Sequence, residues 1–218
     1  MRAMRWIASA GLIVLLAGAA AAAPAWTPVD RVAAVVNDSA ILASDVGRRV
    51  AQYKAAVKTP PEPDKAAQQD EAIHSAAVRD LCDEMLLAQE AARLRIEAPD
   101  AEIDMAVEQV KQQNKFDDAA LARALAANGI TLQIYRDELR RQITRLRVID
   151  RVIRPKVDVS EKAVRDLYMA EKQQNPKLGE FEAEKERLQQ AVFEREIVNT
   201  TEKWLLQRRA SSYIEVRQ

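Results

Sequence analysis

The stretch from Asp30 to Val46 constrains the fold more than any other part of the chain, because it contains two short apolar runs, a turn and a helix start. Val32 to Val36 and Ala40 to Leu42 are β-prone runs. Asn37-Asp38-Ser39, which separates them, consists of residues that readily adopt turn geometry. This pattern predicts a β-hairpin near the start of the folded region.

A helix is expected to follow the hairpin directly. Ser44 is placed to cap the free backbone amides of a helix beginning at Asp45, and the Asp45 carboxylate would favour the positive end of that helix. A hairpin followed by a Ser-Asp helix start resembles the opening of the N-terminal domain in the periplasmic SurA chaperone family.

Most of the remaining sequence is typical of helices separated by short breaks. Apolar residues recur at steps of three and four, which is the spacing of a helix face. Capping residues, prolines and the Asn128-Gly129 pair mark the breaks. Helices are therefore predicted to begin near Asp45, Lys65, Pro99, Asp117, Thr131, Ser160 and Glu180. The second should end near Arg95, the fifth at Pro155, the sixth at Gln174 and the last near Ala210.

The last residues, Tyr213 to Val216, alternate in polarity and predict a strand. A single strand needs a partner, and the only other predicted strands are those of the opening hairpin. We therefore expect the two ends of the chain to meet in one small antiparallel sheet. The predicted fold class is mainly α, with this sheet joining the N-terminal hairpin to the C-terminal strand.

Two further segments resemble the SurA family, in the family's own order. The region from Pro99 through Asn128-Gly129-Ile130 to Tyr135-Arg136-Asp137-Glu138-Leu139-Arg140 resembles the centre of the family's N-terminal domain. The tail from Trp204 to Ile214 resembles the end of its C-terminal helix and strand. The resemblance implies a helical chaperone module formed by residues 26–156 and completed by residues 180–218.

The chain departs from the family at the place where isomerase domains are found. Members commonly carry one or two parvulin-type peptidyl-prolyl isomerase domains between the N-terminal domain and the C-terminal helix. Only residues 157–179 occupy that place here, and they are too few for a domain, so we interpret them as a short connector. His74 and Cys82 both lie in the predicted second helix. No isomerase activity is expected.

The first 25 residues have the layout of a secretory signal peptide. Arg2 and Arg5 precede an apolar run from Ile7 to Ala17, and small residues follow. Cleavage after Ala22 or after Ala25 fits the small-x-small rule, and we prefer Ala25. The apolar run is shorter than the roughly 20 residues that span a bilayer, so we expect export to the periplasm without stable membrane insertion after cleavage.

The sequence contains no recognisable catalytic, metal or cofactor motif. His74 is the only histidine and Cys82 the only cysteine, which excludes a paired-histidine metal site and an intramolecular disulfide. There is no phosphate-binding loop. Scattered Asp and Glu residues are interpreted as solvated helix faces. Removing residues 1–25 lowers the formal net charge from zero by two, which gives no indication of nucleic-acid binding.

The segment from Arg136 to Arg154 holds seven arginines against Asp137, Glu138 and Asp150. One interpretation is that arginine stems cover an apolar face and pair with neighbouring acids. The alternative is that these arginines attract acidic segments of an unfolded client or of a partner near the membrane.

The resemblance implies an ATP-independent periplasmic chaperone that binds unfolded outer-membrane or secreted proteins in a groove between helices. We expect this groove to be lined by Met105, Phe116, Leu121, Leu125 and Tyr135, although residues at this spacing also fit a core. An exported helical scaffold for one fixed partner and a peptidyl-prolyl isomerase remain as alternatives. The sequence leaves client identity and oligomeric state open.

Overall fold

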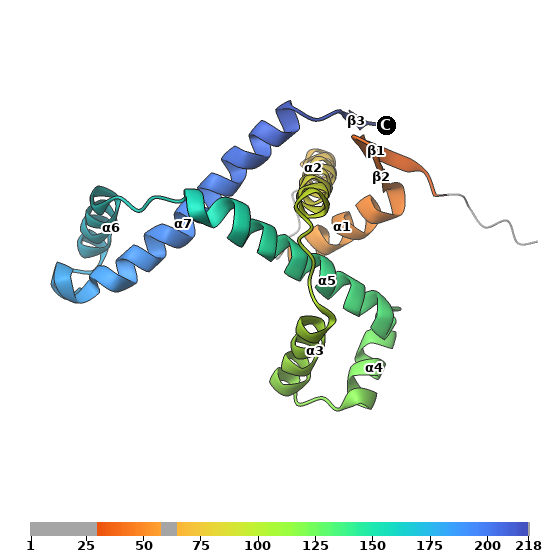
Figure 1. Ribbon diagram of the computed structural model, residues 1–218, viewed down its shortest axis with the longest axis horizontal. Coiled ribbons are helices and arrows are strands. Elements are labelled where there is room, and N and C mark those ends of the chain that lie inside the picture. Colours follow the sequence, from red (N-terminus) through yellow and green to blue (C-terminus); the bar gives the residue numbers. More distant parts are fainter. Residues whose placement is uncertain (1–29, 58–64, 218) are drawn as a thin grey trace, which may run out of the picture.

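The computed structural model describes residues 30–57 and 65–217. The predicted signal peptide and the prolines at 60, 61 and 63 lie outside the described residues. The described part is mainly helical with one small sheet, which confirms the predicted fold class (Figure 1). Its elements are β1 (Val32–Val36), β2 (Ser39–Leu42), α1 (Ala43–Ala56), α2 (Ala66–Leu94), α3 (Asp100–Asn114), α4 (Asp118–Ala126), α5 (Leu132–Val148), a π-helical turn η1 (Ile149–Ile153), a 3-10 turn η2 (Arg154–Lys156), α6 (Glu161–Gln174), α7 (Phe181–Ala210) and β3 (Ile214–Val216).

The sheet joins the two ends of the described chain, as the sequence predicts. Its strand order is β2-β1-β3, and both pairings are antiparallel. Val36 pairs with Ser39 across the hairpin turn and with Ile214 of β3. Ala34 and Val36 are fully buried, so the central strand carries the buried face of the sheet. The chain end therefore completes the structure that the hairpin begins.

Helix capping follows the sequence at several starts and fails at one. The side chains of Asp117, Thr131 and Ser160 each accept a hydrogen bond from a backbone amide three residues ahead. The predicted cap at Ser44 is wrong, because β2 runs directly into α1 and Ser44 already lies inside the helix. The N-cap is Leu42, whose amide donates to the Asp45 carboxylate at 3.4 Å.

Helix α2 is the central element of the fold (Figure 1). Its middle part, from Ala77 to Leu86, packs against β1, β2 and α1 in one core, which contains Cys82. Its last turns pack in a second core with residues of α5, η1 and α7, namely Leu87, Ala91, Ile96, Val148, Ile153, Trp204 and Leu205. Trp204 is thus part of a core that it shares with α2 and with residues at the end of α5. The C-terminal helix completes a structure that starts some 170 residues earlier in sequence, near Asp30.

The observed buried faces match two predicted apolar stripes only in part. The spacing of apolar residues predicts a stripe of Ile73, Ala77, Leu81, Met85 and Ala88 on the second helix. On the fifth it predicts a heptad-like stripe of Leu132, Tyr135, Leu139, Leu146, Ile149 and Ile153. On α2 the buried face contains Ala77, Val78 and Cys82, whereas Ala88 is exposed. On α5 the predicted heptad stripe is wrong at Leu132 and Leu146, which are 46% and 61% exposed, and right at Ile153, which is fully buried. The buried residues there are Val148 and, beyond the helix, Ile153. The π-helical turn η1 changes the phase of the helix, and its wider turn cannot be read from a spacing of 3.6 residues.

Two helical arms extend from this body (Figure 1). In one, α3 and α4 lie beside α5. In the other, α6 packs on α7 around Val164, Leu188 and Val192, with the rings of Tyr168 and Phe181 meeting edge to face at 5.4 Å. The α6–α7 arm contains most of the segment interpreted as a connector, since helix α6 takes up residues 161–174 of it.

Candidate functional site

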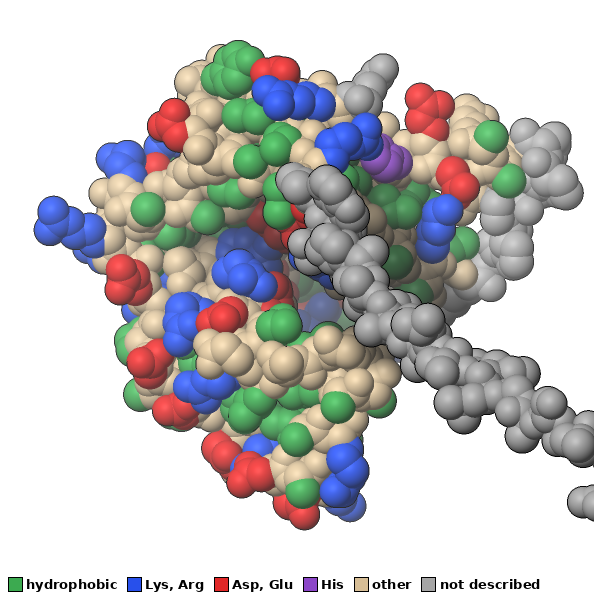
Figure 2. All heavy atoms as spheres, turned by 90° about the vertical axis from the view of Figure 1, so that its right-hand side faces the viewer, with side chains coloured by type: hydrophobic (Ala, Val, Ile, Leu, Met, Phe, Trp, Pro, Cys, Tyr) green, Lys and Arg blue, Asp and Glu red, His purple; other side chains and the backbone are tan. Residues whose placement is uncertain are grey.

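A pocket of about 610 Å³ opens between α2, the connection from α2 to α3, and α5. We call it the interhelical pocket. The face seen in Figure 2 is hollowed near its centre, and acidic and basic side chains gather in the hollow. The residues that line the pocket are Glu84, Leu87, Ala88, Ala91, Ala92, Ile96, Glu97, Ala98, Pro99, Asp100, Glu138, Arg140, Arg141, Thr144 and Arg145.

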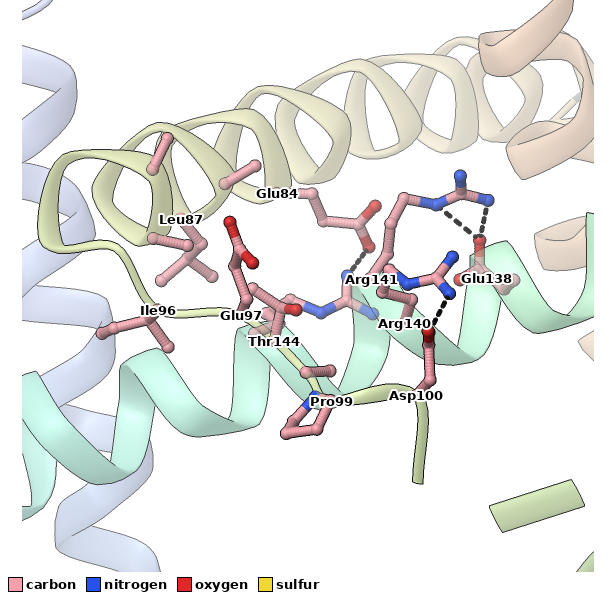
Figure 3. A pocket seen from close by; sticks show the side chains of 15 residues that line it. Glu84, Leu87, Ile96, Glu97, Pro99, Asp100, Glu138, Arg140, Arg141 and Thr144 are labelled. Carbon is pink, nitrogen blue, oxygen red and sulfur yellow. Dashed lines mark hydrogen bonds and ion pairs between the residues drawn. The ribbon is translucent and has the colours of Figure 1, made fainter. Parts of the chain in front are cut away.

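The floor of the interhelical pocket is apolar and firmly placed. Leu87, Ala91 and Ile96 are buried in the second core. Helix α2 ends at Leu94 and is followed by Arg95, whose φ of 54° is left-handed, and the chain then turns and crosses toward α5 (Figure 3). The connection with Ile96 and Pro99 therefore forms one wall, with alanines of α2 opposite it. Small side chains leave the space that the pocket occupies.

Ion pairs surround this floor (Figure 3). Arg140 donates to Asp100 at 2.8 Å and so joins α5 to the start of α3. Arg141 donates to Glu138 on its own helix at 2.6 Å. Burial disfavours the charged form of Glu138, but the bonds from Arg141 outweigh it and hold the pKa of this carboxyl below its usual value. The rim is therefore charged but largely neutralised.

Carboxylates on α2 hold the neighbouring helices in place. Glu84 accepts from Arg49 of α1 at 3.0 Å and also forms an ion pair with Arg145 of α5. Asp83 accepts two bonds from Arg209 of α7, at 2.6 and 2.8 Å. The walls of the pocket are thus fixed by α2. The prediction that scattered acidic residues form solvated helix faces is therefore wrong for Asp83 and Glu84, which hold neighbouring helices.

The arginine-rich segment pairs with acids, as one of the two interpretations predicts. Partners on other elements include Asp104 for Arg136 and Glu102 for Arg147. Six of the seven arginines from Arg136 to Arg154 form ion pairs. Four of them reach an acid on another helix: Arg136, Arg140, Arg145 and Arg147. Arg141 and Arg154 pair with acids three and four residues away in sequence. Long-range pairs of this kind position α3 against α5.

None of the five residues predicted to line a groove lies in the interhelical pocket. Leu121 of α4 is buried, at 5% exposure, whereas Met105 of α3 is 63% exposed. Phe116, Leu125 and Tyr135 are half-buried. All five belong to the α3–α4–α5 region, and the groove that they would form stays a prediction.

Sequence reasoning missed the interhelical pocket, although a signal was present. Ala88, Ala91 and Ala92 recur near the end of α2, and Ala98-Pro99 follows in the connection. Small residues beside a chain reversal leave space between helices that larger residues would fill. The predicted groove was instead based on large apolar residues, which tend to fill space.

Within residues 30–57 and 65–217, no cluster of three or more potential ligands could hold a metal ion. Cys82 is buried among apolar side chains, and burial raises the pKa of its thiol. None of the helices in this part of the chain is long and apolar enough to cross a bilayer.

Comparisons with known proteins agree with this architecture. Residues 2–149 match the family model described as the SurA-like N-terminal domain. Chaperone SurA of Pseudoalteromonas translucida is 29% identical over 182 residues, covering 84% of this chain and 41% of the relative. Chaperone SurA of Cupriavidus pinatubonensis is 35% identical over 144 residues, covering 65% of this chain and 28% of the relative. The chain thus spans about two fifths or less of the length of these relatives.

A solved structure has the same fold at low sequence identity. It comes from a study of PEB4 and Cj1289, two structurally related SurA-like chaperones of Campylobacter jejuni. The match has a TM-score of 0.57 at 14% identity and covers 87% of this chain and all of the other. Together with the family match over most of the sequence, the hairpin, the closing strand and the helix order identify the chain as a member of the family of SurA-like N-terminal domains.

Proposed function

We propose that this protein is an ATP-independent periplasmic chaperone that binds unfolded outer-membrane or secreted proteins. The observation that carries the proposal is the open, apolar-floored interhelical pocket on a SurA-like domain. Leu87, Ile96 and Pro99 offer an apolar surface to a client side chain. The ion pairs at the rim would favour hydration of the pocket and oppose direct packing of its apolar walls against each other.

Binding would come from burial of apolar client surface at about 25 cal/mol per Å². Ordering an unfolded chain offsets part of this gain, so weak and reversible binding in the micromolar range is expected. A volume of about 610 Å³ accepts a few side chains rather than a folded domain. This suits a protein that captures short segments of many clients and releases them without a nucleotide.

The α3–α4–α5 arm would extend the binding surface. Met105, Leu132 and Ile134 are each roughly half to two thirds exposed on this arm. We infer that the predicted groove residues Phe116, Leu125 and Tyr135, which are half-buried, contribute to the same surface, with Leu121 beneath them. An extended client could then contact both the pocket and the arm.

The proposal includes the expected processing and organisation. Residues 1–25 act as a signal peptide that is removed after Ala22 or Ala25, which delivers the chain to the periplasm. Residues 26–156 and 180–218 form the chaperone module, and residues 157–179 stand where relatives of the family carry parvulin domains. Nucleic acid, a cofactor and stable membrane insertion have no part in this function.

The test is suppression of aggregation of a denatured outer-membrane β-barrel by an equimolar amount of the chaperone. Ala88→Phe fills the interhelical pocket from an exposed position on α2. Ala72→Phe makes the same change at an exposed position of α2 outside the pocket. We expect Ala88→Phe to reduce suppression several-fold and Ala72→Phe to leave it intact, with unchanged circular dichroism in both.

Two results would count against the proposal. Equal suppression by both variants would remove the interhelical pocket from the binding surface. Failure of the folded wild-type protein to protect any barrel client, together with capture of a single folded partner, would favour the alternative of an exported scaffold.

A further inference from the structure

A second pocket, of about 420 Å³, lies between β1, α1 and the first half of α2. We call it the hairpin pocket. It is separate from the interhelical pocket, and the two share no lining residue. Its lining residues are Arg31, Ala33, Ala43, Val46, Gly47, Val50, His74, Val78 and Arg217.

The floor of the hairpin pocket is apolar. Ala33, Val46 and Val78 are buried, with 7%, 3% and 6% exposure, and belong to the first core. Val50 is half-buried beside them. Gly47 contributes no side chain, and a Cβ built there would meet nothing within 4 Å. An apolar group of a ligand can therefore rest on valines without displacing the core.

The residues with titratable side chains that line this pocket are all of basic types. They are Arg31 before β1, His74 on α2 and Arg217 after β3, and no acidic residue lines the pocket. The side chains of Arg31 and His74 have no hydrogen bond or ion pair within residues 30–57 and 65–217. The third, Arg217, donates from Nε to Glu215 at 3.0 Å and keeps its other guanidinium nitrogens available.

Apart from Glu215, which pairs with Arg217, the nearby acids have other partners or lie outside the pocket. Asp30 accepts the Ser44 amide at 3.2 Å. Asp70 forms an ion pair with Lys54 at 2.8 Å. Glu71 is one helical turn before His74 but does not line the pocket. The mouth of the pocket is therefore positively charged above an apolar floor.

We propose that the hairpin pocket binds a carboxylate joined directly to an apolar group. The apolar group would lie on Val46, Val50 and Val78, and the carboxylate would accept hydrogen bonds from Arg31 and Arg217 beside the His74 ring. Arginine binds carboxylates through two parallel N–H donors, which gives such a site its specificity. A cation would be repelled, and a neutral apolar molecule would leave the arginines without a new partner.

Two natural molecules share this chemistry. A fatty acid presents a carboxylate on an alkyl chain, and a polypeptide that ends in an apolar residue presents one beside an aliphatic or aromatic side chain. Arg217 reaches the site through the closed sheet, since its amide donates to the Ala33 carbonyl at 2.8 Å. The pocket thus takes residues from both ends of the described chain.

The experiment compares octanoate, octanamide and octylammonium by calorimetry, on the chain purified from the periplasm without a histidine tag. His74 is the only histidine of the sequence, so its ring gives one assigned NMR signal in histidine-labelled protein. We expect octanoate to bind at least tenfold more tightly than octanamide and to shift the His74 signal, with no binding of octylammonium. Equal affinity for octanoate and octanamide, or no His74 shift with any probe, would overturn the proposal.

Substitutions locate the site. Arg31→Gln and His74→Gln should each weaken octanoate binding at least fivefold and leave octanamide unchanged. Arg48→Gln is the matched control, since Arg48 is an exposed arginine of α1 that pairs with Asp45 and does not line the pocket. Loss of octanoate binding in Arg48→Gln as large as in Arg31→Gln would mean non-specific attraction and would refute the site.

A second pair of probes identifies the natural source. An acetylated tetrapeptide ending in leucine is compared as the free carboxylate and as the amide. Tighter binding of the free carboxylate than of octanoate would assign the pocket to polypeptide C-termini, and the reverse order would assign it to fatty acids. Either order supports the proposal, whereas equal binding of the peptide acid and its amide, with no preference for octanoate over octanamide, contradicts it.

Discussion

Asn37 and Tyr213 exchange two hydrogen bonds although 176 positions separate them in the chain. The Asn37 amide donates to the Tyr213 carbonyl at 2.8 Å, and the Tyr213 amide donates to Asn37 Oδ1 at 3.0 Å. Asn37 Nδ2 also donates to Gln89 Oε1 of α2 at 2.7 Å. One turn residue therefore joins the hairpin, the central helix and the closing strand.

Two substitutions of Asn37 should distinguish how much its side-chain hydrogen bonds and its backbone conformation each contribute to stability. Its φ of 53° is left-handed, which glycine adopts freely and alanine does not. We expect Asn37→Gly to lower the free energy of unfolding by about 2 kcal/mol, because two side-chain hydrogen bonds are lost. Asn37→Ala should lose about 1 kcal/mol more from strain. Urea unfolding measures both, with the exposed Asp38→Ala as control, and equal stability of the two variants would contradict the role of φ.

Glu90 should make the free energy of unfolding depend on pH in the acidic range. It is 5% exposed and accepts bonds from Arg93 and Arg208. The bonds from Arg93, with the charge of Arg208, outweigh burial and lower its pKa. A carboxyl whose pKa is lower in the folded than in the unfolded state stabilises the fold at pH values above its unfolded-state pKa of about 4.3. This stabilisation is lost as the pH falls through the folded-state pKa.

The advantage of the wild-type protein over Glu90→Gln, about 1–3 kcal/mol at neutral pH, should therefore shrink below about pH 4. Urea unfolding across that range measures it. Glu97→Gln changes an exposed carboxylate without an ion pair among the described residues and serves as control. If the difference in unfolding free energy between the wild-type protein and Glu90→Gln stays constant or grows in acid, ionisation of this carboxylate does not contribute to stability.

The C-terminal helix should be required for a cooperative fold. Deleting residues 181–218 removes Trp204, Leu205 and β3, so Leu87 and Ile153 of the second core lose their cover. The truncated protein should aggregate or unfold without a sharp transition. A truncated chain as stable as the whole would mean that α7 is an independent appendage.

Within α7, Trp204→Ala should cost about 3–5 kcal/mol, because a large buried side chain is removed. Val198→Ala on the same helix, at a position that is 67% exposed, should cost less than about 0.5 kcal/mol. Chemical unfolding of both variants tests the difference. Similar losses in the two would show that Trp204 adds little to the second core.

Polar substitution of Phe116 and Leu125 separates the two interpretations of the predicted groove. If these half-buried residues line a binding surface, Phe116→Ser with Leu125→Ser should weaken suppression of aggregation while circular dichroism is unchanged. If they belong to the core, the helical signal and cooperative unfolding should fall instead. Met105→Ser, at an exposed position, should weaken suppression in the first case and have no effect in the second.

The protein is expected not to accelerate cis/trans exchange of a proline peptide. Residues 157–179 contain helix α6 and short links, which pack on α7 through Val164. Protease-coupled or NMR exchange assays measure the rate, with a parvulin as positive control. Acceleration that survives further purification and disappears on removing this protein would refute the expectation.

The sequence was sufficient to predict the elements whose signals are local. Helix α6 begins after Ser160 and ends at Gln174, as predicted, because capping and helix-breaking residues act within a few positions. The pairing of β3 with the hairpin was also predicted, since a strand must have a partner. Ser44 was not a cap because β2 continues into α1 without a gap.

Tertiary features account for what could not be predicted. The π-helical turn at Ile149–Ile153 has no reliable sequence mark, and the buried residues around it are Val148 and Ile153, whereas Leu146 is exposed. The burial of Glu90 depends on Arg208, which lies 118 positions away. Both candidate pockets lie between helices or strands that are distant in sequence, and a single sequence does not show how such elements pack against one another. The predicted groove shares no residue with either pocket.

The pairing of β1 with β3 also fixes an order in time. Strand β1 precedes all the described helices in the chain, yet its second neighbour, Ile214–Val216, follows all of them. Closing a loop of this length is slow compared with forming local helices. A nascent chain thus holds an open sheet edge on β1 until residues 214–216 have been made. A protein proposed to shelter unfolded chains must therefore pass through a long period as an unfinished chain itself.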